Sequence, residues 1–260
     1  EWVQKNFIEI KKQSEASTSY GKLLRIDSLF VGSNVVLDFV YTTSEAAGQN
    51  MTTISTKNAC DFIFAKTSEL FGVTHYIIES NYNGDKVVSQ RNLMLGRGHQ
   101  VVAKAVIKRK VLRRILNLDE DFLELNSIFS SSVLGGSSVA AGNIGNNLHV
   151  ANTLCAIYLA TGQDVACIVE NSGAILNSRT DADGNWEVSL TMRSLTVGTV
   201  GGGTRLPQQN QHLAMLGCQG ENSSKKLAEI LAAACLGTEI SLASAIGSKE
   251  FASAHANYGR

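Results

Sequence analysis

The spacing of apolar residues over the first 78 positions predicts helices and strands in alternation. Apolar side chains three or four residues apart indicate helices, whereas β-branched and aromatic runs indicate strands. On these criteria we expect a helix over Trp2–Ala16, two strands within Leu29–Tyr41 around Gly32-Ser33, a helix over Thr53–Phe71 and a buried strand over Val73–Glu79. This alternation predicts an α+β module with a small sheet.

The later positions predict a larger, helix-rich part. Pro207 is the only proline, which favours long uninterrupted elements. We expect a strand over Val101–Ile107, a basic helix over Lys108–Leu116 with Val111, Leu112 and Ile115 turned inward, a buried helix over Ser137–Thr161 ended by Gly162, a hairpin over Ala174–Arg193 with Asp183-Gly184 in its turn, and helices through Gln208–Tyr258. The chain as a whole is therefore expected to have an α+β fold.

Composition narrows the classes of protein to consider. With 260 residues, 44% of them hydrophobic, the chain can bury one large core or two smaller ones. Its 23 basic and 23 acidic residues balance, which gives no support for a nucleic-acid partner. The longest apolar runs are far shorter than the roughly 20 residues that span a bilayer, so we expect no membrane segment.

The cysteines favour a reducing compartment. Five of them are scattered along the chain, and no CxxC pair is present. An odd and dispersed set is not typical of a disulfide framework or a zinc ribbon, so we expect neither disulfides nor a metal. A cytoplasmic protein is the simplest interpretation.

Two segments could bind a phosphorylated ligand. Gly198–Thr204 (GTVGGGT) lacks the spacing of a P-loop or of a GxGxxG fingerprint, but its glycines leave the backbone N–H groups accessible. A tight structural turn is an equally good explanation. Ser44–Met51 (SEAAGQNM) joins a strand to a helix, where a helix N-terminus can bind phosphate. An ordinary helix start capped by Asn50 is the alternative there.

Four titratable positions stand out, and each has an ordinary structural explanation. Lys86 lies in a polar loop, where a solvated charge pair with Asp85 is the default. Asp164 follows Gly162 at a helix end, so its charge must be exposed or held by a cation. His149 is expected to be a satisfied core histidine, and His255 an exposed one.

Taken in order along the chain, these segments resemble the 3-hydroxy-3-methylglutaryl-CoA reductases, and the class I enzymes more than the class II enzymes. The likeness runs from about Trp2 to the end of the chain. Its motifs are Glu45–Met51 (EAAGQNM), Asn81–Val87 (NYNGDKV) followed by Gly96-Arg97-Gly98, His149–Asp164 (HVAN through AIY to GQD), Gly198–Thr204 (GTVGGGT) and Met215–Gly220 (MLGCQG).

The resemblance implies reduction of the thioester of 3-hydroxy-3-methylglutaryl-CoA (HMG-CoA) by two hydrides from NADPH, releasing CoA and mevalonate. It implies that Lys86 stabilises an oxyanion, that Asp164 holds Lys86 charged, and that His255 protonates the departing thiolate. The cofactor-binding residues it implies are Glu45, Gly48, Gln49, Asn50, Met51, Val200, Gly201 and Gly202, and the substrate-binding residues are Asp85, His149 and Asn152.

The resemblance also implies an architecture. Residues 1–78 correspond to a small ferredoxin-like NADP(H)-binding domain, 79–89 to a loop that carries the catalytic lysine, and 90–260 to a large CoA- and substrate-binding domain. Because the active sites of this family lie between subunits, we expect a homodimer or a higher homo-oligomer.

Several positions depart from the family pattern. The glutamate of an ENVG-type motif does not occur in these 260 residues, and because the chain begins at Glu1 without methionine, we expect it to be part of a longer protein. Val87 and Ser132 stand where lysines are expected. Tyr20 replaces an arginine that contacts the NADPH 2′-phosphate in some relatives, so NADPH is favoured while NADH is not excluded. A non-catalytic relative that binds an acyl-CoA or a nicotinamide, and a reductase of a different acyl-CoA, stay as alternatives.

Overall fold

The computed structural model describes residues 1–118 and 121–258. Its Cα trace divides into two compact units, Glu1–Asp85 and Lys86–Arg260, which we call the small unit and the large unit. The boundary falls inside the segment 79–89. Each unit combines helices with a small antiparallel sheet, which confirms the predicted α+β class.

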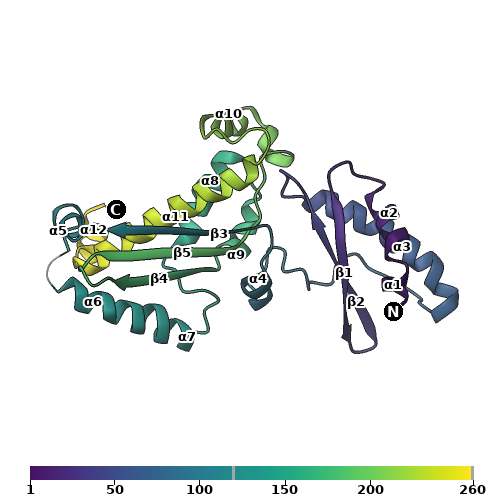
Figure 1. Ribbon diagram of the computed structural model, residues 1–260, viewed down its shortest axis with the longest axis horizontal. Helices are drawn as coiled ribbons and strands as arrows, with labels where there is room; N and C mark the ends of the chain where they lie inside the picture. Colours follow the sequence, from purple (N-terminus) through teal and green to yellow (C-terminus); the bar gives the residue numbers. More distant parts are fainter. Residues whose placement is uncertain (119–120, 259–260) are drawn as a thin grey trace. The chain divides into compact units, whose positions relative to one another are not determined.

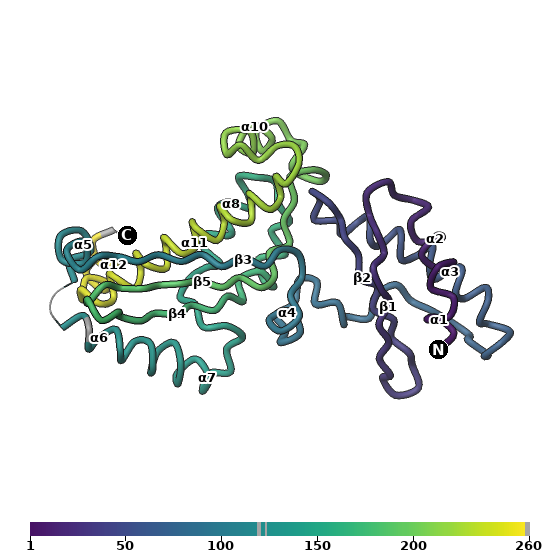
Figure 2. Tube along the Cα trace, viewed as in Figure 1, coloured from purple at the N-terminus to yellow at the C-terminus, as the bar shows by residue number. Residues whose placement is uncertain are grey.

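In the small unit, a two-stranded sheet packs on helices. Its elements are α1 (Trp2–Lys5), α2 (Phe7–Glu15), β1 (Lys22–Val31), β2 (Asn34–Thr42) and α3 (Gln49–Phe71). The strands are antiparallel and turn at Gly32, whose φ of 59° is readily adopted by glycine. Figure 2 shows α2 and α3 on one side of the hairpin, where Ile10, Leu23, Ile26 and Ala59 form the core.

Two expectations for the small unit were wrong. The predicted helix over Trp2–Ala16 is interrupted at Asn6, whose side chain bonds the carbonyl of Trp2 (2.8 Å) in competition with the helical pattern. The predicted buried strand over Val73–Glu79 is absent, although all of its residues are described. Ile77 is 82% exposed. A strand requires a neighbour to pair with, and among the described residues β1 and β2 pair only with each other.

The large unit is built on an antiparallel sheet of order β3-β5-β4. Its strands are β3 (His99–Ile107), β4 (Ala174–Thr180) and β5 (Trp186–Leu195). The predicted β4–β5 hairpin is confirmed, and Gly184 in its turn has a φ of 75°. Alternate residues of the central strand β5 are buried, as expected for a strand with one face on the core.

Helices pack against this sheet (Figure 1). They are α4 (Gln90–Leu95), α5 (Arg109–Ile115), α6 (Phe122–Ile128), the π-helix η1 (Phe129–Ser137), α7 (Ser138–Ala140), α8 (Val150–Thr161), η2 (Val165–Cys167), α9 (Ile168–Asn171), η3 (Gly202–Arg205), α10 (Pro207–Met215), α11 (Ser223–Gly247) and α12 (Phe251–Tyr258). The long α11 packs on β3, β5 and α8, whereas α6 packs on β4. The resulting core includes Leu154, Tyr158, Trp186, Leu190 and Leu231.

The single buried helix predicted over Ser137–Thr161 was wrong. The helix ends at Ala140, just before Gly142, and a new helix begins at Val150. Gly142 and Gly145 adopt φ values of 70° and 88°, and Asn146 bonds the β4 backbone at Leu176 N (2.7 Å). The left-handed glycines and the bond to β4 take the place of helical hydrogen bonds in this segment. The predicted end of the helix is confirmed, because Gly162 caps α8 in the left-handed conformation.

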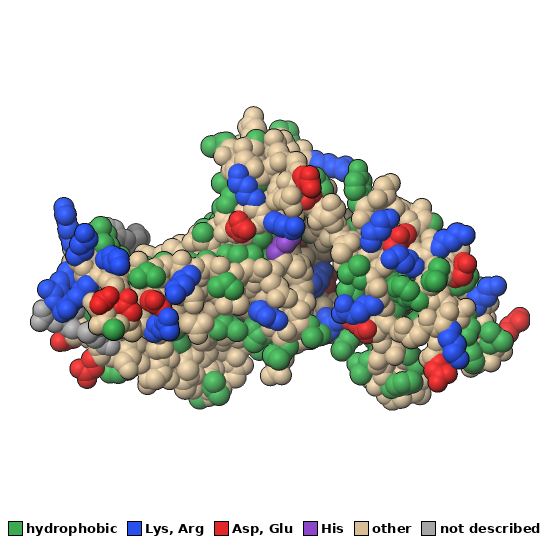
Figure 3. All heavy atoms as spheres, viewed as in Figure 1, with side chains coloured by type: hydrophobic (Ala, Val, Ile, Leu, Met, Phe, Trp, Pro, Cys, Tyr) green, Lys and Arg blue, Asp and Glu red, His purple; other side chains and the backbone are tan. Residues whose placement is uncertain are grey.

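The basic segment forms α5, as predicted, with the side chains of Lys108, Arg109, Lys110, Arg113 and Arg114 exposed. Lys and Arg side chains gather at one end of the large unit (Figure 3). Leu112 is buried as expected, but Ile115 is 70% exposed, so its predicted inward orientation was wrong. Because α5 is short, only a few of its side chains can face the core.

By length and hydropathy, α11 also meets the criteria for a membrane-spanning helix. The expectation of only short apolar runs overlooked it, because Thr238, Glu239 and several serines interrupt its Ala- and Leu-rich sequence. Its packing on β3, β5 and α8 is that of a core helix.

Candidate active site

Two of the residues predicted to act in catalysis are in contact. Lys86 Nζ lies 3.1 Å from Asp164 Oδ2, and the two side chains are 43% and 36% exposed. At this exposure the pair contributes less than about 1 kcal/mol to stability. Asp164 is additionally held by its other oxygen, which caps η2 by accepting the N–H of Ala166 (3.1 Å). The acid after Gly162 is therefore at the favourable N-terminal end of the next helix.

A buried carboxylate, that of Glu170, contacts the backbone of Lys86. The side chain of Glu170, on α9, is fully buried, and its Oε2 accepts the backbone N–H of Lys86 (3.1 Å). Its Oε1 pairs with the Arg97 guanidinium and accepts the hydroxyl of Thr196 (2.8 Å). Sequence reasoning assigned no role to Glu170 or Arg97. The available signal was a single acid within the apolar stretch VACIVEN, which must have a partner if buried.

The glycine-rich segment adjoins the end of α8. The N–H of Gly198 donates to Gln163 Oε1 (2.9 Å), and a Cβ placed on Gly203 would lie 2.7 Å from the carbonyl oxygen of Gly162. Only glycine permits such an approach of two backbones. The structure thus brings together two motifs about 40 positions apart in sequence, GQD and GTVGGGT, with Gly201, Gly202 and the exposed Val200 in the second.

His149 is placed by a second buried acid. It is the residue before α8, and Glu239 on α11 accepts the N–H of Leu148 (2.7 Å) and of His149 (2.8 Å). The same carboxylate lies 2.9 Å from His149 Nδ1. An Nδ1–H donated to Glu239 leaves Nε2 as the atom available to a ligand. Asn152, exposed in the first turn of α8, was predicted together with His149.

In the small unit, the predicted cofactor motif surrounds the N-terminus of α3. Gly48 precedes this helix at a φ of 84°, and a Cβ there would lie 2.2 Å from Thr43 Cγ2. Asn50 lies inside the helix, so the alternative in which it serves as the cap was wrong. Gln49 donates to Asp85 Oδ1 (3.0 Å).

The rest of the motif is less enclosed. Met51 Sδ accepts the hydroxyl of Thr18 (2.9 Å), Glu45 is half-buried and Asn50 is exposed. The first turn of this 23-residue helix offers backbone N–H groups and the positive end of a dipole, which suit a phosphate.

The third predicted catalytic residue is elsewhere in the large unit. His255 lies exposed on α12, with Nδ1 2.8 Å from the carbonyl of Phe251 and its ring 4.5 Å from the Phe251 ring. Figure 1 shows α12 beside α5, at the opposite end of the sheet from α9. The structure therefore does not bring His255 to Lys86 and Asp164.

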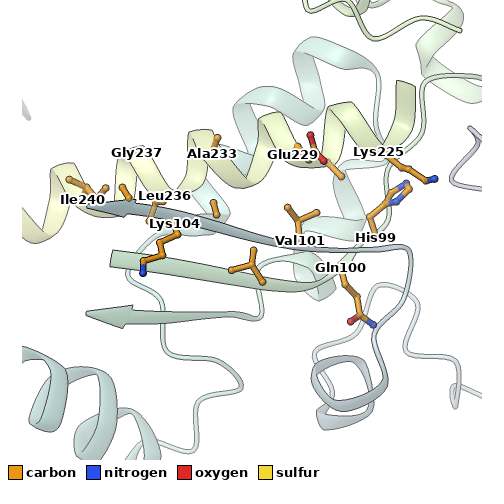
Figure 4. A pocket seen from close by; sticks show the side chains of 14 residues that line it. His99, Gln100, Val101, Lys104, Lys225, Glu229, Ala233, Leu236, Gly237 and Ile240 are labelled. Carbon is orange, nitrogen blue, oxygen red and sulfur yellow. The ribbon is translucent and has the colours of Figure 1, made fainter. Parts of the chain in front are cut away.

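A groove of about 830 Å³ lies between β3 and α11 (Figure 4). His99 and Lys225 stand at one end, and Ala233, Gly237 and Ile240 line its helical wall. None of the predicted site residues lines it. The groove is thus a feature separate from the Lys86–Asp164 pair.

The arrangement around Lys86 suits stabilisation of negative charge. The ammonium of Lys86 is held by the carboxylate of Asp164, and its backbone N–H is held by the carboxylate of Glu170. A preorganised cation beside accessible space stabilises an oxyanion without reorganisation during reaction.

The family model described as hydroxymethylglutaryl-coenzyme A reductase matches residues 1–260. Among curated proteins, the 3-hydroxy-3-methylglutaryl-coenzyme A reductases of Methanocaldococcus jannaschii and Haloferax volcanii are each 39% identical over the whole chain. The chain spans 64% of the length of both relatives. The 3-hydroxy-3-methylglutaryl-coenzyme A reductase of Camptotheca acuminata is 35% identical over 98% of the chain and 43% of its own length.

A class II 3-hydroxy-3-methylglutaryl-CoA reductase from Streptococcus pneumoniae, solved bound to NADPH, has a similar fold. The TM-score is 0.69 over 94% of this chain and 58% of that one, at 19% identity. This likeness concerns the fold alone. With the family model matching from end to end, the chain belongs to the hydroxymethylglutaryl-coenzyme A reductase family.

Proposed function

We propose that the full-length protein reduces HMG-CoA to mevalonate, releasing CoA and consuming two NADPH. The observation that carries this proposal is the contact between Lys86 and Asp164, 3.1 Å apart, each within a segment that matches the family. Curated relatives that are 39% identical to the chain carry the name of this enzyme.

Lys86 is proposed to stabilise the oxyanion that forms when hydride adds to the thioester carbonyl. Its ammonium is the cation that the developing charge requires. Asp164 keeps that ammonium charged and oriented, since an opposite charge within about 4–6 Å favours both ionised forms.

Two further groups are required by the chemistry. A thiolate leaves and needs a proton, which we assign to His255; for this role the exposed α12 must bring His255 to the substrate. The second reduction needs an acid, which we assign to a glutamate outside these 260 residues. Both assignments rest on the resemblance.

The residues present fit the cofactor and substrate groups. NADPH, when bound, supplies hydride, and the N-terminus of α3 with Gly48 and its neighbours is proposed to hold a phosphate of this cofactor. Gly201 and Gly202 can let a ligand approach the backbone, because a Cβ at either would meet nothing within 4 Å. Asp85, His149 and Asn152 are proposed to bind the acyl-CoA.

We further propose that the protein works in the cytoplasm as a homodimer or higher homo-oligomer. The reason is that in this family the active site lies between subunits. Sedimentation of the full-length protein tests the oligomeric state, and a monomer that retained full activity would contradict it.

The test of the proposed function is turnover by the full-length protein. Oxidation of NADPH with HMG-CoA is followed for the unsubstituted protein, Lys86→Ala and Lys104→Ala. Lys104 is a matched control, because it is also half-exposed and paired with an acid, Glu187 at 3.3 Å. We expect Lys86→Ala to lower kcat by on the order of 100-fold or more, while Lys104→Ala leaves it unchanged.

Two alternatives are separated by the same assay. Val87 and Ser132, in place of lysines, reduce the positive charge available to a substrate carboxylate. An unsubstituted protein that oxidises NADPH with another acyl-CoA and not with HMG-CoA would identify a different reductase. Binding of HMG-CoA and NADPH without turnover would identify a non-catalytic relative, and full activity of Lys86→Ala would refute the assignment of Lys86.

A further inference from the structure

We propose that Glu170 is a positioning residue that sets the conformation of Lys86 and thereby aims its ammonium at Asp164. This inference rests on the proposed role of Lys86 in catalysis. Glu170 has no part in the chemistry itself, because its carboxylate is fully buried and is bonded to protein groups.

The backbone of Lys86 adopts an unfavourable conformation. Its φ is 57°, in the left-handed region that L-residues with a side chain rarely occupy. A residue stays there only if the surroundings hold it. The hydrogen bond from the N–H of Lys86 to Glu170 Oε2 (3.1 Å) restrains Lys86 in this conformation.

The carboxylate of Glu170 is itself fixed in place. Arg97 compensates its charge, and the hydroxyl of Thr196 donates to it (2.8 Å). Arg97 is positioned by its flanking glycines, since a Cβ on Gly98 would lie 2.2 Å from the carbonyl oxygen of Leu195. A buried, compensated carboxylate with several hydrogen bonds is a rigid anchor.

Lys86 is therefore held at its backbone and at its ammonium by residues from one short stretch of the chain. Asp164, before η2, holds Nζ, and Glu170, on α9, holds the backbone N–H. Moving the backbone anchor would rotate the side chain away from Asp164. Displacement of a catalytic group by about 1 Å can cost on the order of 100-fold in rate.

The experiment compares Glu170→Gln with Ser178→Ala in the full-length protein. The glutamine keeps the shape but has one acceptor oxygen, so it cannot accept from both Lys86 and Thr196 and also pair with Arg97. Ser178 is the control, because it is also buried in the large unit and bonds Trp186 Nε1 (2.8 Å) without touching Lys86. Steady-state kinetics and hydrogen exchange of the Lys86 amide are measured for both.

We expect Glu170→Gln to lower kcat by about 100-fold with KM for NADPH unchanged, and to speed exchange at Lys86. Ser178→Ala should lower thermal stability and leave both kcat and the Lys86 amide unaffected. Unchanged exchange at Lys86 in a folded Glu170→Gln protein would overturn the proposal, as would faster exchange with unchanged kcat.

The two proposals fail in distinguishable ways. If the unsubstituted protein did not reduce HMG-CoA, the proposed function would fail, and exchange at Lys86 would still decide whether Glu170 holds this residue. If Glu170→Gln does not fold, Thr196→Val is measured in its place. This substitution removes only one of the hydrogen bonds to the Glu170 carboxylate, so the expected loss of kcat is smaller. An unchanged kcat in that variant would then count against the proposal.

Discussion

Gly162 and Gly203 are in backbone contact, so that a Cβ on Gly203 would lie 2.7 Å from the carbonyl oxygen of Gly162. The contact joins the end of α8 to the glycine-rich segment next to Asp164. The two backbone segments cannot separate without shifting the residues that follow each glycine. These include Asp164 after Gly162 and Thr204 after Gly203.

Gly203→Ala is expected to destabilise the large unit by about 1–3 kcal/mol, because the methyl group overpacks a backbone contact. The free energy of unfolding in urea measures the loss. Gly237→Ala on α11 is the control: no atom lies within 4 Å of its added Cβ, and alanine favours a helix by up to about 1 kcal/mol over glycine. Equal stability of the two variants would show that the contact is looser than described.

Glu239→Ala is expected to destabilise the protein by at least about 2 kcal/mol, because the N–H groups of Leu148 and His149 lose their buried acceptor. Chemical denaturation measures the change. Thr153→Val is the matched control, since it removes the neighbouring α8–α11 hydrogen bond to Thr238 (2.7 Å) and is expected to cost about 1 kcal/mol. A Glu239 variant as stable as the control would contradict the role of Glu239 as the acceptor of these two N–H groups.

The β4–β5 hairpin is expected to lose stability in acid through Asp181. Hydrogen bonds from the side chain and N–H of Asn185, and from the N–H of Asp183, lower the pKa of Asp181 from 3.8. A lowered folded-state pKa means that the stabilisation is present above the unfolded value and is lost as the pH falls through the folded one. Unfolding free energy against pH should therefore be flatter below pH 4 in Asp181→Asn. Parallel curves for the two proteins would contradict this.

The thiols of Cys235, which is buried, and of Cys60, which is half-buried, are expected to be unreactive in the folded protein. Burial raises the pKa of Cys235 to about 12 and that of Cys60 to about 11, so both are protonated at pH 8. Thiolates are the reactive form. Labelling with iodoacetamide, located by mass spectrometry, should leave both unmodified in the native protein and modify both in urea. Native labelling at the unfolded rate would show that these regions open readily.

Elements with local determinants could be predicted from the sequence. Asp183-Gly184 predicted the hairpin, and Gly162 predicted the end of α8, because a positive φ within a few residues decides both. The helix broken at Gly142 and the missing strand at Val73–Glu79 depend on partners distant in sequence. Hydrophobic pattern alone does not contain that information.

The contacts of the candidate site also depend on residues that are distant in the sequence. The pairing of Lys86 with Asp164 could be anticipated only through the resemblance to a family, since 78 positions separate them in the sequence. Glu170 and Glu239 were missed because the groups that they bind, which include the backbone N–H groups of Lys86 and Leu148, lie far from them in the sequence. The role of His255 in protonating the thiolate is implied by the resemblance and stays a prediction.

The bonds from Leu148 and His149 to Glu239 have a consequence for the order of folding. Glu239 follows His149 by 90 positions, so the segment before α8 gains this acceptor only after α11 has docked. During synthesis, α8 would leave the ribosome many seconds before the residue that completes it, at about 5–20 residues per second. Maturation of the His149 region is thus a late event, coupled to completion of the C-terminal helices.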